Sequence, residues 1–139
     1  GAVILEPWVW LVQVLRATGA RPDLRRLLAI LRGMGEVPGN PPNVAGYPGA
    51  SAWLSSSSTA GRFTAASLIA AAVPDDAPVL AAAAERDWAL LADLLLRPEG
   101  FSTATRSALE DLGTGADRGA RPGQAALTLA LASPDLLVA

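Results

Sequence analysis

Four consecutive serines, Ser55 to Ser58, are the residues whose type and spacing most readily suggest catalysis. A serine becomes a nucleophile only when a neighbouring base accepts its proton, and proteins ordinarily use histidine or lysine for this step. The sequence contains no His, and all eleven of its cations are Arg. We therefore expect the serine run to cap a helix and not to attack a substrate.

Carboxylate pairs are the second candidate for chemistry. They are Asp75/Asp76, Glu85/Asp87 and Glu110/Asp111. Glycosidases use two facing acids, but neighbours in a sequence need not converge in space. The spaced ligands of a calcium loop are missing, and the absence of Cys and His removes thiolates, imidazoles and nearly every transition-metal site. We expect no catalytic set, no metal and no cofactor within this chain, which leaves open whether a parent protein is an enzyme.

The longest irregular stretch runs from residue 36 to 50 and holds four Pro and three Gly. Proline blocks regular helix and strand, so this stretch is predicted to be a loop. Loops of this length in compact domains are often functional. The candidate ligand or partner site combines loop residues with an aromatic and an arginine that follow them: Pro42, Asn43, Gly46, Tyr47, Pro48, Gly49, Trp53 and Arg62.

Two interpretations of this candidate site stay open. In the functional one, Tyr47 and Trp53 pack on a sugar ring or on a partner's proline, and Arg62 binds a carboxylate or phosphate through its planar fork. In the structural one, the loop is a rigid plug across the helical core, both aromatics are buried, and Arg62 holds loop carbonyls. We favour the structural interpretation, because large aromatics dominate core energetics in small domains.

The elements that must position these residues are helices. Apolar residues make up 51% of the chain and are dominated by Ala and Leu, which lose least on entering a helix. The net charge of −2 offers no basic field for nucleic acid, and the apolar stretch over residues 2–15 is too short and interrupted to span a membrane. We predict an all-α, irregular multi-helix bundle with a long Pro/Gly-rich loop. Residues 1–139 form a single helical domain or the C-terminal fragment of a larger domain.

Proline, glycine and capping residues set the predicted helix boundaries. The expected helices begin at Pro7, Pro22, Ser51 (a short one, to Leu54), about Ser58, Pro78, Trp88, Ser102 and Pro122, and a short terminal helix follows Ser133. The stretch that begins at Pro78 is expected to break near Glu85. Residues 113–121, with three Gly and three charges, are predicted to form an exposed, mobile loop. Trp8, Trp10 and Trp88 are expected in the core, with the alternative that Trp10 faces a missing N-terminal part of the protein.

The central motif carries a family resemblance. Residues 40 to 50 read Asn-Pro-Pro-Asn-Val-Ala-Gly-Tyr-Pro-Gly-Ala, and Trp53-Leu54, the serine run and Arg62-Phe63 follow. This pattern resembles the most characteristic stretch of the bacterial domain-of-unknown-function 1800 (DUF1800) family. Tyr47 stands where that family usually has Trp, and Ala50 where it usually has Gly. The helix at residues 7–18 and the closing Ser133-Pro134-Asp135 are similar to the family's flanking segments, so the resemblance runs through the whole chain.

The resemblance implies that the chain is the C-terminal part of a longer, helical and commonly exported bacterial protein without an assigned activity. The residues themselves leave the compartment unknown, and export is suspected from the resemblance alone. The first functional hypothesis is a structural or interaction module whose partner is the missing N-terminal part of its own parent chain. The alternatives are a non-catalytic wall of an enzyme active site completed by that part, and glycan or polymer binding through the loop aromatics.

Overall fold

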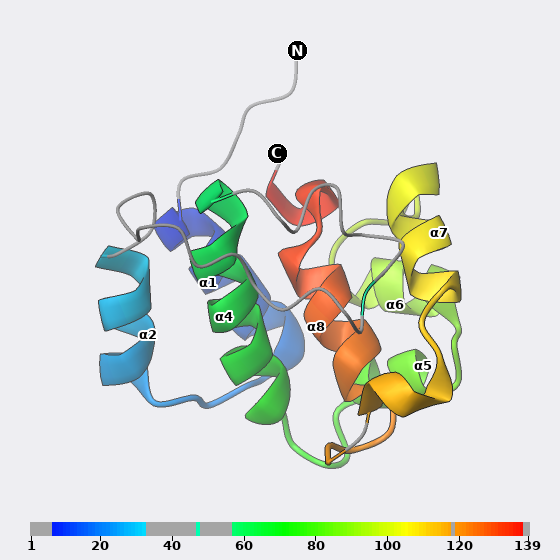
Figure 1. Cartoon of the computed structure of the whole chain (residues 1–139), viewed down its shortest axis with the longest axis horizontal. Helices are drawn as coiled ribbons and strands as arrows, with labels where there is room; N and C mark the ends of the chain where they lie inside the picture. The colour runs from blue at the N-terminus through cyan, green and yellow to red at the C-terminus, as the bar shows by residue number, and fades with distance from the viewer. Residues whose placement is uncertain (1–6, 33–46, 48–56, 118, 138–139) are drawn as a thin grey trace.

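A computed structural model describes residues 7–32, 47, 57–117 and 119–137 of the chain. Seven α-helices account for most of these residues, and no strand occurs among them. The predicted all-α class and its multi-helix arrangement are therefore confirmed (Figure 1). Of the predicted Pro/Gly-rich loop, Tyr47 is the residue that lies within the described part of the chain.

Helix α8 (Gln124–Ala132) forms the centre of the fold. Residues 125–132 are all buried, as expected of a helix that carries Ala and Leu on every side. Helix α4 (Ser57–Ala71) lies beside α8, and small buried side chains such as Ala66 and Ala70 allow the two helices to approach closely. Figure 1 shows helix α2 on one side of this central pair, α1 behind α4, and α5, α6 and α7 on the other side.

Helix α1 (Pro7–Thr18) begins at the predicted proline and ends before Gly19, whose φ of +69° is the left-handed conformation that commonly follows a helix. Trp10 is fully buried, and its indole Nε1 donates a hydrogen bond to the carbonyl oxygen of Leu131 at 3.1 Å. The core position predicted for Trp10 is correct. The core position predicted for Trp8 is wrong, because its side chain is 50% exposed. Two residues of helix rotate a side chain by about 200°, so Trp8 and Trp10 face opposite ways.

The remaining helices follow the predicted order. They are α2 (Leu24–Arg32), α5 (Pro78–Ala84), α6 (Trp88–Leu94), α7 (Thr103–Glu110) and a final 3-10 helix, η3 (Pro134–Leu137). Short polar side chains cap the starts of α2, α6 and α7, whereas α5 begins with Pro78 and has no side-chain cap. Ser102 accepts a hydrogen bond from the backbone N–H of Thr105 at 3.3 Å, and Asp87 accepts one from Leu90 at 3.2 Å. The predicted break near Glu85 separates α5 from α6.

The segment between α7 and α8 differs from its prediction. Within the part expected to be an exposed loop, the chain forms a 3-10 helix, η2 (Thr114–Asp117), and Ala116 packs against the core. Helix α8 begins at Gln124 and not at Pro122, because the intervening Gly123 takes a left-handed φ of +85° that an α-helix cannot contain. This segment therefore positions the N-terminus of the central helix.

Candidate functional site

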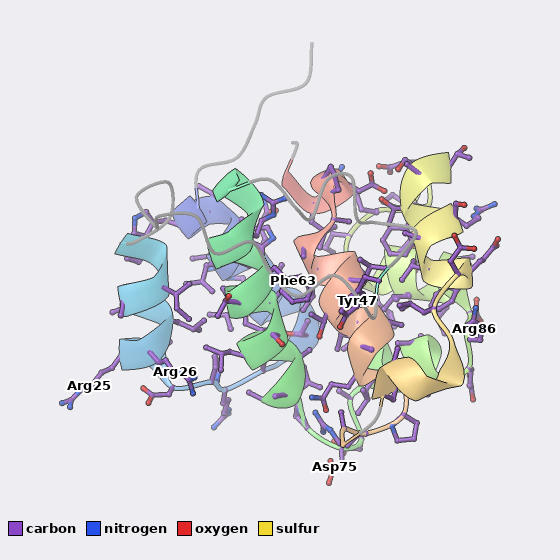
Figure 2. All side chains as sticks on the ribbon, in the orientation of Figure 1. Arg25, Arg26, Tyr47, Phe63, Asp75 and Arg86 are labelled. Carbon is purple, nitrogen blue, oxygen red and sulfur yellow. The ribbon has the colours of Figure 1, made fainter. Side chains whose placement is uncertain are left out.

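Tyr47 is the described residue of the predicted loop, and it lies over the central helices close to Phe63 (Figure 2). The ring of Tyr47 contacts the ring of Phe63 edge to face, with centroids 5.2 Å apart and planes at 84°. Burial raises the pKa of the Tyr47 phenol, and the negative charge of Asp117 adds to this increase. A half-buried tyrosine in such a contact contributes to packing, which is the role that the structural interpretation of the loop assigns to it.

Arg62 lies on α4 and binds the C-terminal end of the central helix. Its Nε donates a hydrogen bond to the carbonyl oxygen of Ala132, the last residue of α8, at 3.1 Å. Helices leave such carbonyls without a partner of their own, so the bond satisfies a polar group at the helix end. Burial lowers the pKa of the Arg62 guanidinium to about 10. The carbonyl that Arg62 holds within the described chain therefore belongs to a helix and not to the loop.

Asp117 caps the start of the central helix, a role that sequence reasoning missed. Its Oδ2 accepts a hydrogen bond from the backbone N–H of Gly123 at 3.0 Å, and its Oδ1 accepts one from Ala125 at 2.8 Å. The carboxylate thus satisfies N–H groups at the start of α8, where negative charge is also favoured by the helix dipole. An acid placed this far before a helix falls outside the usual capping pattern, so no sequence signal identifies it.

Arg121 holds the end of α4. Its guanidinium donates to the carbonyl oxygen of Ala70 at 2.9 Å and to that of Val73 at 2.8 Å. The same group pairs with the exposed carboxylate of Asp75 at 2.8 Å. Asp75 is therefore a solvent-exposed partner of a structural arginine, and no group of potential metal ligands that includes it is found among the described residues.

Arg86 holds the end of α7 in the same way. Its two terminal nitrogens donate to the carbonyl oxygens of Leu109 at 3.4 Å, Glu110 at 2.9 Å and Leu112 at 3.2 Å. The guanidinium carbon also lies 5.2 Å from the ring centroid of Trp88, a cation–π distance. A hollow of about 330 Å³ opens beside Arg86 and Asp117, but both charged groups already bind helix ends.

Helix α1 carries an exposed apolar surface, which we call the α1 outer face: Trp8, Val9 and Val12, with exposed fractions of 50%, 43% and 46%. A hollow of about 190 Å³ adjoins the same helix, and we call it the α1 groove. Its lining residues come from α1, from the turn after α6 and from η3: Gln13, Val14, Ala17, Leu95, Leu96, Arg97 and Leu136. Sequence reasoning recognised α1 as strongly apolar but did not identify the groove.

The other members of the predicted site, Pro42, Asn43, Gly46, Pro48, Gly49 and Trp53, lie outside the described residues. Tyr47 contacts Phe63, the residue that follows Arg62. Arg62 itself binds the C-terminal end of α8, whereas Asp117 binds the N-terminal end of that helix. No cluster of His, Cys, Asp or Glu that could hold a metal ion is found in the described chain. Nor does any described helix have the length and apolarity needed to cross a membrane.

The described chain is thus an all-α module in which Arg62, Arg86, Arg121 and Asp117 bind the ends of helices. The model of the family described as "Protein of unknown function (DUF1800)" matches residues 1–138. The chain belongs to this family, as the motif around Tyr47 indicated. The searches of curated proteins and of solved structures gave no match.

Proposed function

We propose that the chain is a structural interaction module of a longer, exported bacterial protein, and that its α1 outer face packs against the preceding part of the same parent chain. The exposure of Trp8, Val9 and Val12 on one helix carries this proposal. Contiguous exposed apolar surface marks a contact site, whereas single exposed apolar residues are ordinary. The longer, exported parent is what the resemblance to DUF1800 implies.

The arrangement of these residues suits a helical partner. Trp8 and Val12 are one turn apart and Val9 lies next to them, so one helix laid along α1 would cover all three. Full burial of a large apolar side chain contributes about 1.5–3 kcal/mol. Because roughly half of each side chain is still exposed, docking would recover about 2–4 kcal/mol in total.

The polar side chains support a role without catalysis in this chain. Asp117, Arg86 and Arg121 are engaged with backbone groups of neighbouring helices. A catalytic acid or base needs an accessible substrate position within hydrogen-bond reach, and these groups use that reach for structure. The module therefore contributes apolar surface and rigidity to the parent.

Serine substitution on the α1 outer face of the full-length parent tests this function. Val12→Ser is expected to lower the thermal midpoint of the parent by several degrees, because a side chain buried by docking is lost. Leu24→Ser on α2 is the matched control, since Leu24 is 57% exposed and outside the proposed contact. Equal midpoints for the two variants would contradict docking through α1.

One observation favours a second candidate, a wall of an anion-binding enzyme site. Arg62 is a half-buried cation whose pKa is lowered by burial, and it makes no ion pair with a described acid. A bound carboxylate or phosphate would supply the missing charge. Thermal melts of the parent in acetate and in phosphate, compared for wild type and Arg62→Gln, test this role. An equal response of the two proteins to both anions would rule it out.

A further inference from the structure

Two residues other than glycine hold left-handed backbone conformations in the described chain: Arg86, with φ of +59°, and Leu96, with φ of +66°. Such a conformation brings Cβ close to the following carbonyl oxygen, and it lowers the folding equilibrium constant roughly five- to thirtyfold per residue. Strained residues of this kind persist when the surroundings hold them, and they cluster at functional positions. Each of the two therefore calls for a compensating interaction.

Arg86 has such an interaction within the fold. Its side chain leaves the turn after α5, donates to carbonyl oxygens of Glu110 and Leu112 and stacks on Trp88. Hydrogen bonds to a charged group at a helix end are among the stronger ones in proteins. The strain at Arg86 is thus offset by contacts that the chain itself provides.

Leu96 has no comparable compensation. The turn after α6 is closed by backbone bonds alone, from the N–H of Arg97 to the carbonyl oxygen of Ala92 at 2.8 Å and from Leu96 to Asp93 at 3.0 Å. Glycine is the usual residue at this position of a helix end, because it adopts the conformation without strain. The leucine side chain is 66% exposed, so it gains little from burial. Leucine here is unfavourable for folding and needs another explanation.

The position of Leu96 supplies an explanation for this unfavourable leucine, because the side chain forms part of the α1 groove. The groove volume of about 190 Å³ is below the roughly 300–1,000 Å³ typical of small-molecule sites, which suits one apolar side chain. Its floor includes Val14 and Leu136, and Gln13 links it to the α1 outer face one turn after Val9. The groove and the outer face therefore form one continuous surface.

The charge of this surface indicates the chemistry of its partner. Arg16 is exposed on α1 one turn after Val12 and forms no ion pair with any described residue. The described residues of α1 include no acid. A second cation, Arg97, lines the groove and pairs with Glu99 at 3.4 Å. Because Glu99 offsets the charge of Arg97, Arg16 supplies the positive charge of this surface, and the surface complements an apolar segment that carries a carboxylate.

We propose that Leu96 and the α1 groove receive a leucine-sized side chain from a helix in the preceding part of the parent chain. That helix carries Asp or Glu within one turn of the inserted residue, and this acid meets Arg16. The inference rests on the proposed docking of α1 and adds the inserted residue, the acid and the role of Leu96. It explains why a strained, exposed leucine occupies a position where glycine would favour folding.

Photo-crosslinking in the full-length parent tests the partner. A benzophenone amino acid replaces Leu96 in one variant and Leu24 in the control, because both side chains are largely exposed. We expect the position-96 variant to crosslink within the same chain at several times the yield of the control. Mass spectrometry should place the crosslink on an apolar residue with an acid within four positions. Crosslinks of equal yield, or crosslinks to a segment without an acid, would overturn the proposal.

Paired glycine substitutions test the role of Leu96 independently. In the isolated chain, Leu96→Gly should raise the folding equilibrium constant by up to about fifteenfold, because relief of the left-handed strain is partly offset by the greater freedom of glycine in the unfolded chain. Arg86→Gly should instead lower the constant, because three hydrogen bonds are lost. In the parent, Leu96→Gly should instead lower the thermal midpoint. A gain in both proteins would overturn the role of Leu96. Loss of stability for Val12→Ser but not for Leu96→Gly would leave α1 docking standing and refute only this inference.

Discussion

Gly123 is the position where one added methyl group should disturb the fold most. A Cβ atom at Gly123 would lie 2.4 Å from the backbone nitrogen of Ala84, 2.8 Å from its Cα and 2.9 Å from the carbonyl oxygen of Leu80. All three atoms are backbone atoms of helix α5, so no side-chain rotation relieves the clash. The φ of +85° adds strain for any residue with a Cβ.

The expected magnitude of Gly123→Ala follows from three contributions. The left-handed conformation costs about 1–2 kcal/mol for alanine, and crowding in a packed interior costs about 1–3 kcal/mol. The reduced freedom of the unfolded chain offsets about 0.4–1 kcal/mol. The sum is a loss of about 3 kcal/mol, which for a chain of 139 residues lowers the thermal midpoint by roughly 9–15 °C.

Two other glycines separate the contributions in the same denaturation assay. Gly19 shares the positive φ, at +69°, but a Cβ there meets nothing within 4 Å, so Gly19→Ala should cost at most about 1.6 kcal/mol. Gly113 has neither the positive φ nor a close neighbour, and Gly113→Ala should be neutral or stabilising. If Gly123→Ala and Gly19→Ala lose equal stability, the close approach of Gly123 to α5 does not constrain the fold.

Three further predictions concern single polar groups. Trp10→Phe should cost about 1–3 kcal/mol in urea unfolding, because the buried carbonyl of Leu131 loses its donor; an unchanged midpoint would contradict this. The absorbance of tyrosinate at Tyr47, the chain's one tyrosine, should titrate at higher pH in the folded chain than in urea. Because the pKa of Tyr47 is higher in the folded chain than in the unfolded chain, the neutral phenol stabilises the fold fully below about pH 10. This contribution is lost as the pH rises through the pKa of the folded state. Asp117→Asn should lower the pKa of Tyr47 only partly, since burial is the larger cause; full return of the pKa would refute that ranking. The substitution should also cost about 1 kcal/mol of stability, because an amide has one acceptor oxygen for the two N–H groups that the carboxylate binds.

Helix positions were predictable because they depend on local chemistry. Proline begins α1 and α5, Ser102 caps α7, and an Ala/Leu segment with no polar side marks the buried α8. The loop between α7 and α8 was not predictable in the same way. Its order depends on Asp117 reaching α8 and on Gly123 approaching α5, which are contacts between separate elements. The motif around Tyr47 identified the family but not the ring contact that Tyr47 makes.

The candidate surface on α1 likewise depends on contacts between separate elements that the sequence does not show. An apolar helix in a sequence indicates burial, and Trp10 and Val14 fulfil that expectation. An apolar residue of α1 is buried or exposed according to how many neighbouring helices surround α1, and the topology sets that number. The strain at Leu96 is also invisible in the sequence, because a leucine at the end of a leucine-rich helix looks like one more core residue.

The arginines connect the fold to the proposed function. Arg62, Arg86 and Arg121 each bind the C-terminal end of a helix, where the charge of the guanidinium complements the helix dipole. Arg62 donates to one carbonyl there, and Arg86 and Arg121 each donate to several. These three arginines, of the eleven in the chain, thus hold neighbouring helices together. Arg16 differs, since it lies in the last turn of its own helix on the exposed apolar side. If this surface packs against another helix, as proposed, the charge of Arg16 would be buried there and would need an acid on that helix.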